Sequence, residues 1–344
     1  MISTSSQAAR TAPARQRTPW ARRAGLALLA LILALATAGA LYQAGASAAD
    51  RRAFPAPGQL VDVGGFKMHI LCSGSATGAP TVILDTLSGG SMLSWAWVQP
   101  EVARGARVCS FDRAGYGWSE PDPQPESAAR AARNLHALLA SAGVPGPYVL
   151  VGHSKGGIYA RAYAAAYPAE VAGMALIDAS TPTQFERHPE WLAQERSFGR
   201  MAALFPLLAR LGLFHLFFAR GGEIDFAELP RPAHDALAAF WSSPEFWQRQ
   251  RASIAAGPRI FAEARGLGGL GDMPLMVVSA ASGGQPGWAE LQNELAALSR
   301  NSAHRLVPGA THASLVFNPA HARQVAAAIL DLVAAVRAHA QVRG

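Results

Sequence analysis

A serine between two glycines is the first residue of this chain whose setting could support catalysis. Ser154 lies in the segment 152–156 (GHSKG), after an apolar strand-like run at 147–151 and before an alanine-rich helical pattern at 158–167. The G-x-S-x-G spacing at a strand-to-helix turn lets the backbone bend sharply and exposes the serine hydroxyl at the tip. The sequence therefore predicts a nucleophile elbow with Ser154 as the nucleophile.

The base that would activate this serine is expected among the ten histidines of the chain. A serine hydroxyl is a poor nucleophile at neutral pH and needs a neighbouring base to take its proton. His312 is the best candidate, because it follows the last short strand-like run, 304–307, in a Gly-Ala-Thr loop. His153 directly precedes Ser154, so its side chain should point elsewhere, and we interpret it as packing support.

Strands alternate with helices along most of the chain and would position these residues. The runs 59–63 and 66–72, joined by Gly64 and Gly65, predict an opening hairpin. Further strand-like runs cover 81–84, 108–112, 147–151, 171–178, 274–279 and 304–307, and helical patterns cover 127–142, 158–167, 288–298 and 319–338. This order predicts an α/β fold with a mostly parallel eight-stranded sheet and helices on both faces.

The alternation is interrupted by a helix-rich, aromatic segment, 181–271, which we interpret as a helical lid. The core would then consist of 59–180 and 272–344. No charged residue lies between Leu211 and Ala219, so part of the lid could line an apolar pocket or touch a membrane surface.

The order of these elements and their loops resembles the α/β-hydrolase family over about residues 59–338. Four segments carry the resemblance in the family's order: the loop 85–90 after the third strand, 111–119 (FDRAGYGWS), which is similar to D-R-x-G-x-G-x-S, the elbow, and 309–312 (GATH) with 318–319 (NP), which is similar to the terminal histidine loop. The resemblance implies the α/β-hydrolase fold and a Ser-acid-His arrangement.

The acid of that arrangement departs from the family's usual pattern. Similar enzymes most often carry it just after the strand that follows the lid, but the loop 280–287 contains no carboxylate, and the next acid is Glu290. Asp178 ends the preceding strand, where some family members place the acid. We therefore predict that Asp178 is the acid, with Glu290 as the alternative. Either residue keeps the chain order Ser, acid, His. A cap of the lid's first turn is the structural alternative for Asp178.

Acyl transfer also needs donors for the oxyanion of the tetrahedral intermediate. Elbow geometry supplies the backbone N–H of Lys155. The second donor is expected from the loop after the third strand, at Leu87 or Ser88, where the family often has His-Gly. We interpret Asp112 and Arg113 as a pair that braces loops.

Composition and charge indicate an enzyme-sized globular chain and argue against a nucleic-acid partner. The 344 residues are 50% hydrophobic and 15% charged, with a formal charge of +7. Five arginines precede residue 24, so the rest of the chain carries only about +2.

Those arginines form a basic tail, 1–23, before an uncharged apolar run, 24–42. Nineteen helical residues span roughly 28 Å, close to the thickness of a bilayer's hydrocarbon core. The run predicts a signal anchor in the cytoplasmic or inner membrane, with the catalytic domain on the extracytoplasmic side and a linker at 43–58. A cleaved signal peptide, cut near 46–48 (ASA), is the alternative and would give a secreted enzyme.

The chain has two cysteines, Cys72 and Cys109, in separate strand-like runs. They could form a disulfide in an oxidising compartment, or remain two buried thiols that pack as small apolar residues. The sequence leaves both open.

The predicted function is that of a serine hydrolase that cleaves the ester bond of a small, apolar substrate through an acyl-enzyme at Ser154, with His312 and Asp178. We expect no metal or organic cofactor, because no His/Cys cluster at ligand spacing and no phosphate loop are evident. The alternatives are an acyltransferase or perhydrolase that uses the same triad, or a membrane-tethered binding protein without turnover.

Overall fold

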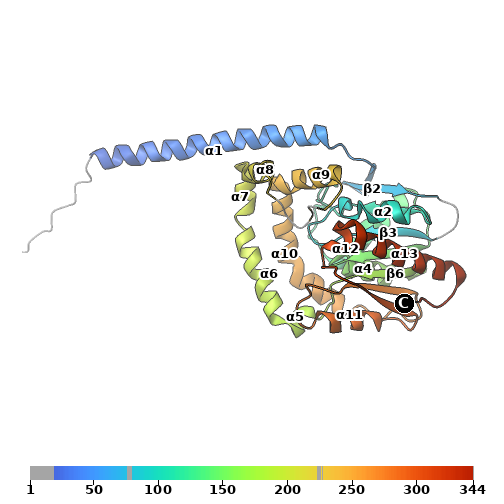
Figure 1. Ribbon diagram of the computed structural model, residues 1–344. Helices are drawn as coiled ribbons and strands as arrows, with labels where there is room; N and C mark the ends of the chain where they lie inside the picture. Colours follow the sequence, from blue (N-terminus) through green and yellow to red (C-terminus); the bar gives the residue numbers. More distant parts are fainter. Residues whose placement is uncertain (1–18, 76–79, 223–225, 227, 344) are drawn as a thin grey trace, which may run out of the picture.

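The computed structural model describes residues 19–75, 80–222, 226 and 228–343, and it contains one eight-stranded sheet (Figure 1). The strand order is β1-β2-β4-β3-β5-β6-β7-β8; β1 with β2 and β2 with β4 pair antiparallel, and the other neighbours are parallel. The strands are β1 Gln59–Asp62, β2 Lys67–Ser73, β3 Thr81–Asp85, β4 Val108–Phe111, β5 Tyr148–His153, β6 Val171–Ile177, β7 Leu275–Ala280 and β8 Ser302–Val307. The predicted α/β fold class is confirmed.

Successive residues of the central strands face two separate cores, because side chains alternate across a strand. In β3, Val82 and Leu84 belong to one core and Ile83 to the other. The helices on the first face are α2 (Val98–Val102), α12 (Ser314–Phe317) and α13 (Pro319–Ala338), with the 3₁₀ turn Met92–Trp95. The helices on the second face are α3 (Ala128–Ser141), α4 (Gly156–Ala166) and α11 (Trp288–Ala296). Burial on both faces explains the continuous apolar runs of the parallel strands.

Between β6 and β7 the chain forms helices instead of continuing the sheet. They are α5 (Gln184–Arg187), α6 (Pro189–Ala202), α7 (Phe205–Arg210), α8 (Leu213–Ala219), α9 (Arg231–Ser242) and α10 (Pro244–Arg265). Prolines in the first turns of α6, α7, α9 and α10 mark where these helices begin, because proline has the φ angle of a helix and the N–H that it lacks would have no partner there; α10 also contains Pro258 in its interior. Gly212, with φ +75°, separates α7 from α8. These helices lie together beside the carboxyl edge of the sheet (Figure 1).

The N-terminal helix is longer than the sequence indicates. Helix α1 covers Pro19–Ala53, so residues 43–53, expected in the linker, continue the apolar helix. This stretch is alanine-rich and contains no proline, and the helix ends just before Pro55, since the residue preceding a proline disfavours helical geometry. In the described part of the chain, α1 is the one unbroken helix long and apolar enough to cross a membrane. Most of the predicted basic tail, 1–23, lies outside the described residues.

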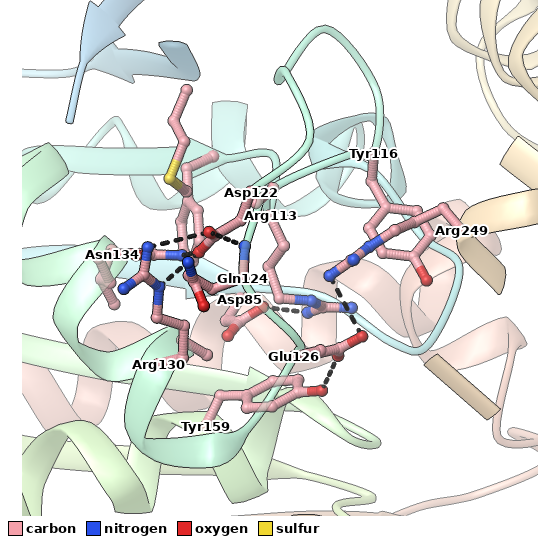
Figure 2. Close-up of a pocket in the computed structure, with 15 residues that line it drawn as sticks. Asp85, Arg113, Tyr116, Asp122, Gln124, Glu126, Arg130, Asn134, Tyr159 and Arg249 are labelled. Carbon is pink, nitrogen blue, oxygen red and sulfur yellow. Dashed lines mark hydrogen bonds and ion pairs between the residues drawn. The ribbon is translucent and has the colours of Figure 1, made fainter. Parts of the chain in front are cut away.

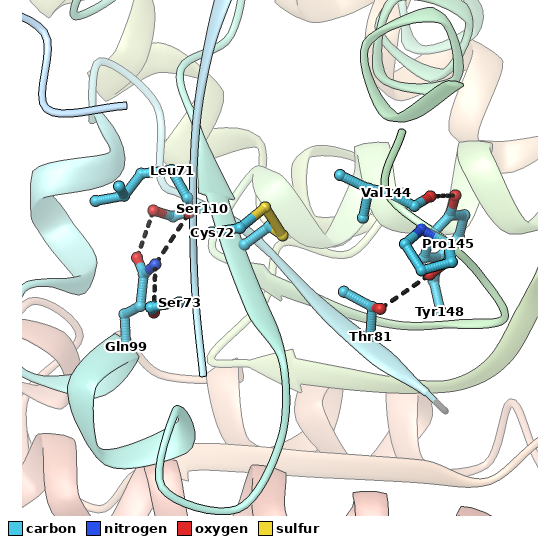
Figure 3. Close-up of a disulfide and its surroundings, with 10 residues drawn as sticks. Leu71, Cys72, Ser73, Thr81, Gln99, Ser110, Val144, Pro145 and Tyr148 are labelled. Carbon is cyan, nitrogen blue, oxygen red and sulfur yellow. Dashed lines mark hydrogen bonds between the residues drawn. A yellow bond between two sulfur atoms is a disulfide. The ribbon is translucent and has the colours of Figure 1, made fainter. Parts of the chain in front are cut away.

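A disulfide joins the two cysteines across the antiparallel strands β2 and β4 (Figure 3). Cys72 and Cys109 are direct partners in the strand register, with their Cα atoms 4.0 Å apart. Beside them, Gln99 Nε2 donates to the carbonyl of Leu71 at 3.0 Å, and Ser110 Oγ donates to Gln99 Oε1 at 2.5 Å. Of the two alternatives that the sequence left open, the structure has the disulfide.

Candidate active site

Ser154 occupies a tight turn between β5 and α4. Its φ of +56° is a left-handed conformation that non-glycine residues rarely adopt. Three backbone hydrogen bonds hold it: Ser154 N–H donates to Ile177 O at 3.1 Å, and Ser154 O accepts from the N–H groups of Gly157 at 3.1 Å and Ser180 at 3.0 Å. Backbone strain of this kind persists only where the surroundings fix it, and it is concentrated at functional sites.

The two glycines of the motif are required by close backbone approach. A Cβ at Gly152 would lie 2.5 Å from Gly157 N, within the first turn of α4. A Cβ at Gly156 would lie 2.7 Å from the carbonyl oxygens of Asp85 and Thr86, in the loop after β3. Any side chain at these positions would push the helix away from the strand ends, so the G-x-S-x-G spacing reflects packing around Ser154.

Asp178 and His312 meet at the carboxyl edge of the sheet. Asp178 Oδ2 lies 2.6 Å from His312 Nδ1, and Asp178 Oδ1 accepts from Trp288 Nε1 at 2.9 Å and from Ala280 N–H at 3.2 Å. Burial of Asp178 favours its neutral form, but the bond to His312 and these two donors outweigh it and lower its pKa below the ordinary value. An ionised Asp178 would hold the His312 ring in one orientation and tautomer.

The alternative acid, Glu290, lies elsewhere. It is an exposed residue in the first turn of α11, and no hydrogen bond or ion pair joins it to His312 in the described part of the chain. Trp288, two residues earlier, is the contact that α11 makes with Asp178. Of the two predicted acids, the structure brings only Asp178 to the histidine.

Ser154, Asp178 and His312 line one cavity of about 530 Å³ between the sheet edge and the lid. Lid residues Trp191 and Phe198 of α6 line it from the other side. No hydrogen bond joins Ser154 Oγ to His312 among the described residues, although both line the cavity; such contacts are often long before substrate binds. The volume is in the range of small-molecule sites.

The predicted oxyanion donors lie in two loops that pack against each other. Within the described ranges, no protein acceptor is present for the N–H groups of Leu87, Ser88 and Lys155. Arg113 fixes the first loop, since its Nη1 donates to Thr86 O at 2.7 Å and its Nη2 to Leu87 O at 2.6 Å. The C=O and N–H of a planar trans peptide point in opposite directions, so these two bonds also set where the N–H groups of Leu87 and Ser88 point.

Arg113 belongs to a buried charge network beside the site (Figure 2). Its guanidinium also pairs with Asp85, and Glu126 accepts from Tyr159 and, at 3.3 Å, from Arg249. The network surrounds a small cavity of about 30 Å³. The sequence interpretation of Arg113 as a brace identified its role in the loop but not the peptides that it holds.

Lys155 directs its side chain away from the catalytic cavity and toward that network. Its Nζ donates to Ser253 Oγ at 3.0 Å and lies 3.8 Å from Glu126 Oε1. Only the backbone of Lys155 is therefore available to a substrate bound at Ser154.

His153 packs against His312, in agreement with its interpretation as packing support. Its Nε2 lies 3.1 Å from the backbone oxygen of His312, and the two rings are 4.7 Å apart. Burial, with a smaller effect of His312, lowers the pKa of His153 to about 3, so the ring is neutral at physiological pH. His153 therefore supports His312 through ring packing and this polar contact. The two residues are 159 positions apart in the sequence, so local sequence cannot show that they meet.

Comparison with known proteins identifies the family of this chain. The sequence model of the alpha/beta hydrolase fold matches residues 80–319, so the chain belongs to the alpha/beta hydrolase family. The crystal structure of Cfl2 from Burkholderia cenocepacia has the same fold, with a TM-score of 0.63 and 24% identity over 78% of this chain and 93% of that one.

Two curated relatives match over parts of their length. An uncharacterised protein of Schizosaccharomyces pombe is 28% identical over 62% of this chain and 39% of its own length. A 2-hydroxy-6-oxononadienedioate/2-hydroxy-6-oxononatrienedioate hydrolase of Dechloromonas aromatica is 36% identical over 33% of this chain and 41% of its own. The chain thus spans less than half the length of these relatives. The family match and the similarity to the Dechloromonas aromatica hydrolase support a hydrolase.

Proposed function

We propose that this hydrolase cleaves carboxylic esters through a covalent acyl-enzyme on Ser154. The observation that carries the proposal is the common cavity in which the strained serine turn faces the His312–Asp178 pair. A hydroxyl exposed on such a turn, with a histidine oriented by a buried carboxylate, is the arrangement that nucleophilic acyl transfer needs.

In the proposed reaction, His312 takes the proton of Ser154 as Oγ attacks the ester carbonyl carbon. The oxyanion accepts hydrogen bonds from the N–H of Lys155 and from that of Leu87 or Ser88. His312 then protonates the leaving alcohol as the carbon–oxygen bond breaks. Water, deprotonated by His312, attacks the carbonyl carbon of the acyl-enzyme; His312 then returns this proton to Ser154 Oγ as the acyl–oxygen bond breaks and the acid is released.

Active-site labelling with a fluorophosphonate, with hydrolysis of p-nitrophenyl butyrate in parallel, tests this proposal. We expect Ser154→Ala to abolish labelling and to lower kcat at least about 10⁴-fold. Asp178→Asn should lower kcat by about 10⁴-fold through the wrong histidine tautomer, whereas Glu290→Gln should be unchanged. Wild-type protein that is folded but neither labels nor turns over would instead support the binding-protein alternative. Added alcohols or peroxide would reveal an acyltransferase or perhydrolase through their products.

We also propose that α1 is retained as a membrane anchor. Gln43 of α1 is buried and donates from Nε2 to Ser242 O of α9 at 3.2 Å, while its Oε1 contacts His215 Nδ1 of α8 at 2.9 Å. Cleavage near 46–48 would remove this residue and leave the lid without its contact. Intact-mass analysis of membrane-extracted protein tests this: a mature N-terminus near Ala49 would exclude the anchor.

A further inference from the structure

Helices α6 and α7 of the lid lie on the side of the domain from which α1 projects (Figure 1), and helices α6 to α8 carry exposed apolar side chains. Six side chains of α6 to α8 and the turn between α6 and α7 are between 40% and 62% exposed. These residues, here called the lid surface, are Phe198, Met201, Leu204, Leu207, Leu213 and Phe217. Six large apolar side chains exposed along three consecutive helices favour a contact with a partner or a membrane over ordinary solvent exposure.

Helix α1 is fixed to the lid at one end of this surface. The two backbones approach so closely that a Cβ at Gly39 would lie 2.8 Å from Leu211 O. Further along α1, His215 Nε2 contacts Asp50 Oδ2 at 2.7 Å, and the bonds of Gln43 join the helix to α8 and α9. The carboxyl half of α1 is therefore part of the domain, whereas its apolar amino half is exposed.

The length of that exposed half determines where a bilayer would end. The uncharged run 24–42 of α1 is roughly 28 Å long, close to the hydrocarbon thickness of a bilayer. Gly39 would then lie within one helical turn of the boundary of the hydrocarbon core, and the lid residues that contact it would lie at the same depth. Figure 1 shows α6 and α7 running across the direction of α1, so they would lie along the membrane plane rather than across it.

We propose that the lid surface inserts into the lipid leaflet on the domain's side of the bilayer. The charges around it fit this partner, since Arg200, Arg210 and Arg220 are exposed among the apolar residues and can reach lipid phosphates. An amphipathic helix with an apolar face and a basic border is typical of such interfacial contacts.

The same surface leads to the catalytic cavity. Phe198 belongs to the lid surface and also lines the cavity beside Ser154. Met201 follows about one turn later on the same side of α6, so one apolar face joins lipid to the cavity. We infer that the substrate is a membrane-resident ester with a long apolar chain, which enters past Phe198. This second inference rests on the proposed hydrolase function.

Fluorescence quenching in lipid nanodiscs tests the membrane contact directly. The full chain is labelled with an NBD fluorophore at Leu204→Cys, at Leu33→Cys of α1, and at Leu306→Cys of β8, a leucine as exposed as Leu204 but on the edge strand that closes the far end of the sheet. Lipids with a doxyl quencher near the headgroup should quench the label at 204 at least half as much as that at 33, and leave 306 unquenched. Quenching at 204 no greater than at 306 would overturn the proposal.

Rates of ester hydrolysis distinguish failure of the proposed entry route from failure of the proposed hydrolase function. The triple variant Met201→Asp, Leu204→Asp, Leu207→Asp should hydrolyse a long-chain ester embedded in the nanodisc at least about 10-fold more slowly than wild type. It should retain wild-type rates on p-nitrophenyl butyrate, as should Leu306→Asp on both esters. Equal rates of wild type and triple variant on the embedded ester would overturn the entry route. Wild-type protein without any turnover would remove the proposed function and this route, while the quenching result would still decide the membrane contact.

Discussion

The sheet edge below the catalytic cavity and the lid above it hold their side chains in opposite ways. Below, polar groups are buried and bonded: Asp178 is only 1% exposed and is in contact with His312, Trp288 and the backbone of Ala280. Above, apolar groups are left partly open, and Leu204 is 62% exposed. The sheet edge fixes the orientation of polar groups, and hydrogen bonds to a transition state depend on that orientation. The lid instead provides apolar surface area, and the binding free energy of an apolar group increases with the area that it covers.

This contrast separates the expected kinetic effects. Substitutions at the sheet edge should lower kcat, because they disturb interactions made with the transition state. Substitutions of lid residues that line the cavity should raise KM, because they remove contacts that substrate and transition state share.

After the triad variants, the largest expected effect is at Arg113, a positioning residue that would not touch substrate. Arg113→Lys keeps a positive charge near Asp85 but cannot hold the carbonyls of both Thr86 and Leu87. We expect kcat on p-nitrophenyl butyrate to fall about 100-fold, the effect of a lost oxyanion donor, with KM nearly unchanged.

Arg130→Lys is the matched control. Arg130 also donates two hydrogen bonds, from Nε to Asp122 Oδ2 at 2.6 Å and from Nη2 to Asp122 Oδ1 at 2.9 Å, but it does not contact the loop after β3. It should retain wild-type kcat. A wild-type kcat in Arg113→Lys would show that the loop holds its N–H groups without Arg113. A parallel rise in KM would point to general distortion of the site.

Local sequence was sufficient for the strands and for the elbow. The β3, β5, β6 and β7 runs are apolar because both of their faces are buried, so they are evident without any tertiary information. Ser154 is marked by glycines that only a tight turn requires. The catalytic role of Ser154, His312 and Asp178 stays a prediction until the variants are measured.

Contacts between distant segments were beyond local sequence. Asp178 and Glu290 are both acids that keep the order Ser, acid, His. Only the contact between Asp178 and His312, which are 134 residues apart in the sequence, distinguishes the two candidates. The sequence analysis also did not predict that α1 continues through residues 43–53, because the polar residues of this stretch were interpreted as part of a linker. In the structure, Gln43 and Asp50 find partners on the lid, which is 165 residues or more away.

A smaller effect is expected from His153, whose burial at the sheet edge opposes protonation of its ring. His153 is fully buried, and its pKa of about 3 in the folded state lies below the ordinary 6.5. Below pH 6.5 the unfolded chain therefore binds a proton that the folded chain does not, so stability is lost as pH falls. This group should lower the free energy of unfolding by about 2 kcal/mol between pH 7 and pH 5.

Urea unfolding of wild type and His153→Phe at the two pH values measures that contribution. The variant has no titrating group at this position, so its stability should change by about 2 kcal/mol less than that of wild type. Equal changes in the two proteins would mean that His153 can be protonated in the folded state, and that the sheet edge is more open than its contacts indicate.

The smallest effect is in the lid, where Phe198 lines the cavity and is 40% exposed. Phe198→Ala removes apolar area that is already partly open, so we expect a loss of about 1 kcal/mol in binding, or roughly a five-fold rise in KM on p-nitrophenyl hexanoate at constant kcat. Phe217→Ala is the control, because Phe217 is 46% exposed but does not line the cavity, and its KM on this soluble ester should stay at the wild-type value. A fall in kcat of Phe198→Ala would show that α6 helps to orient the reacting groups, and the lid would then share the directional role of the sheet edge.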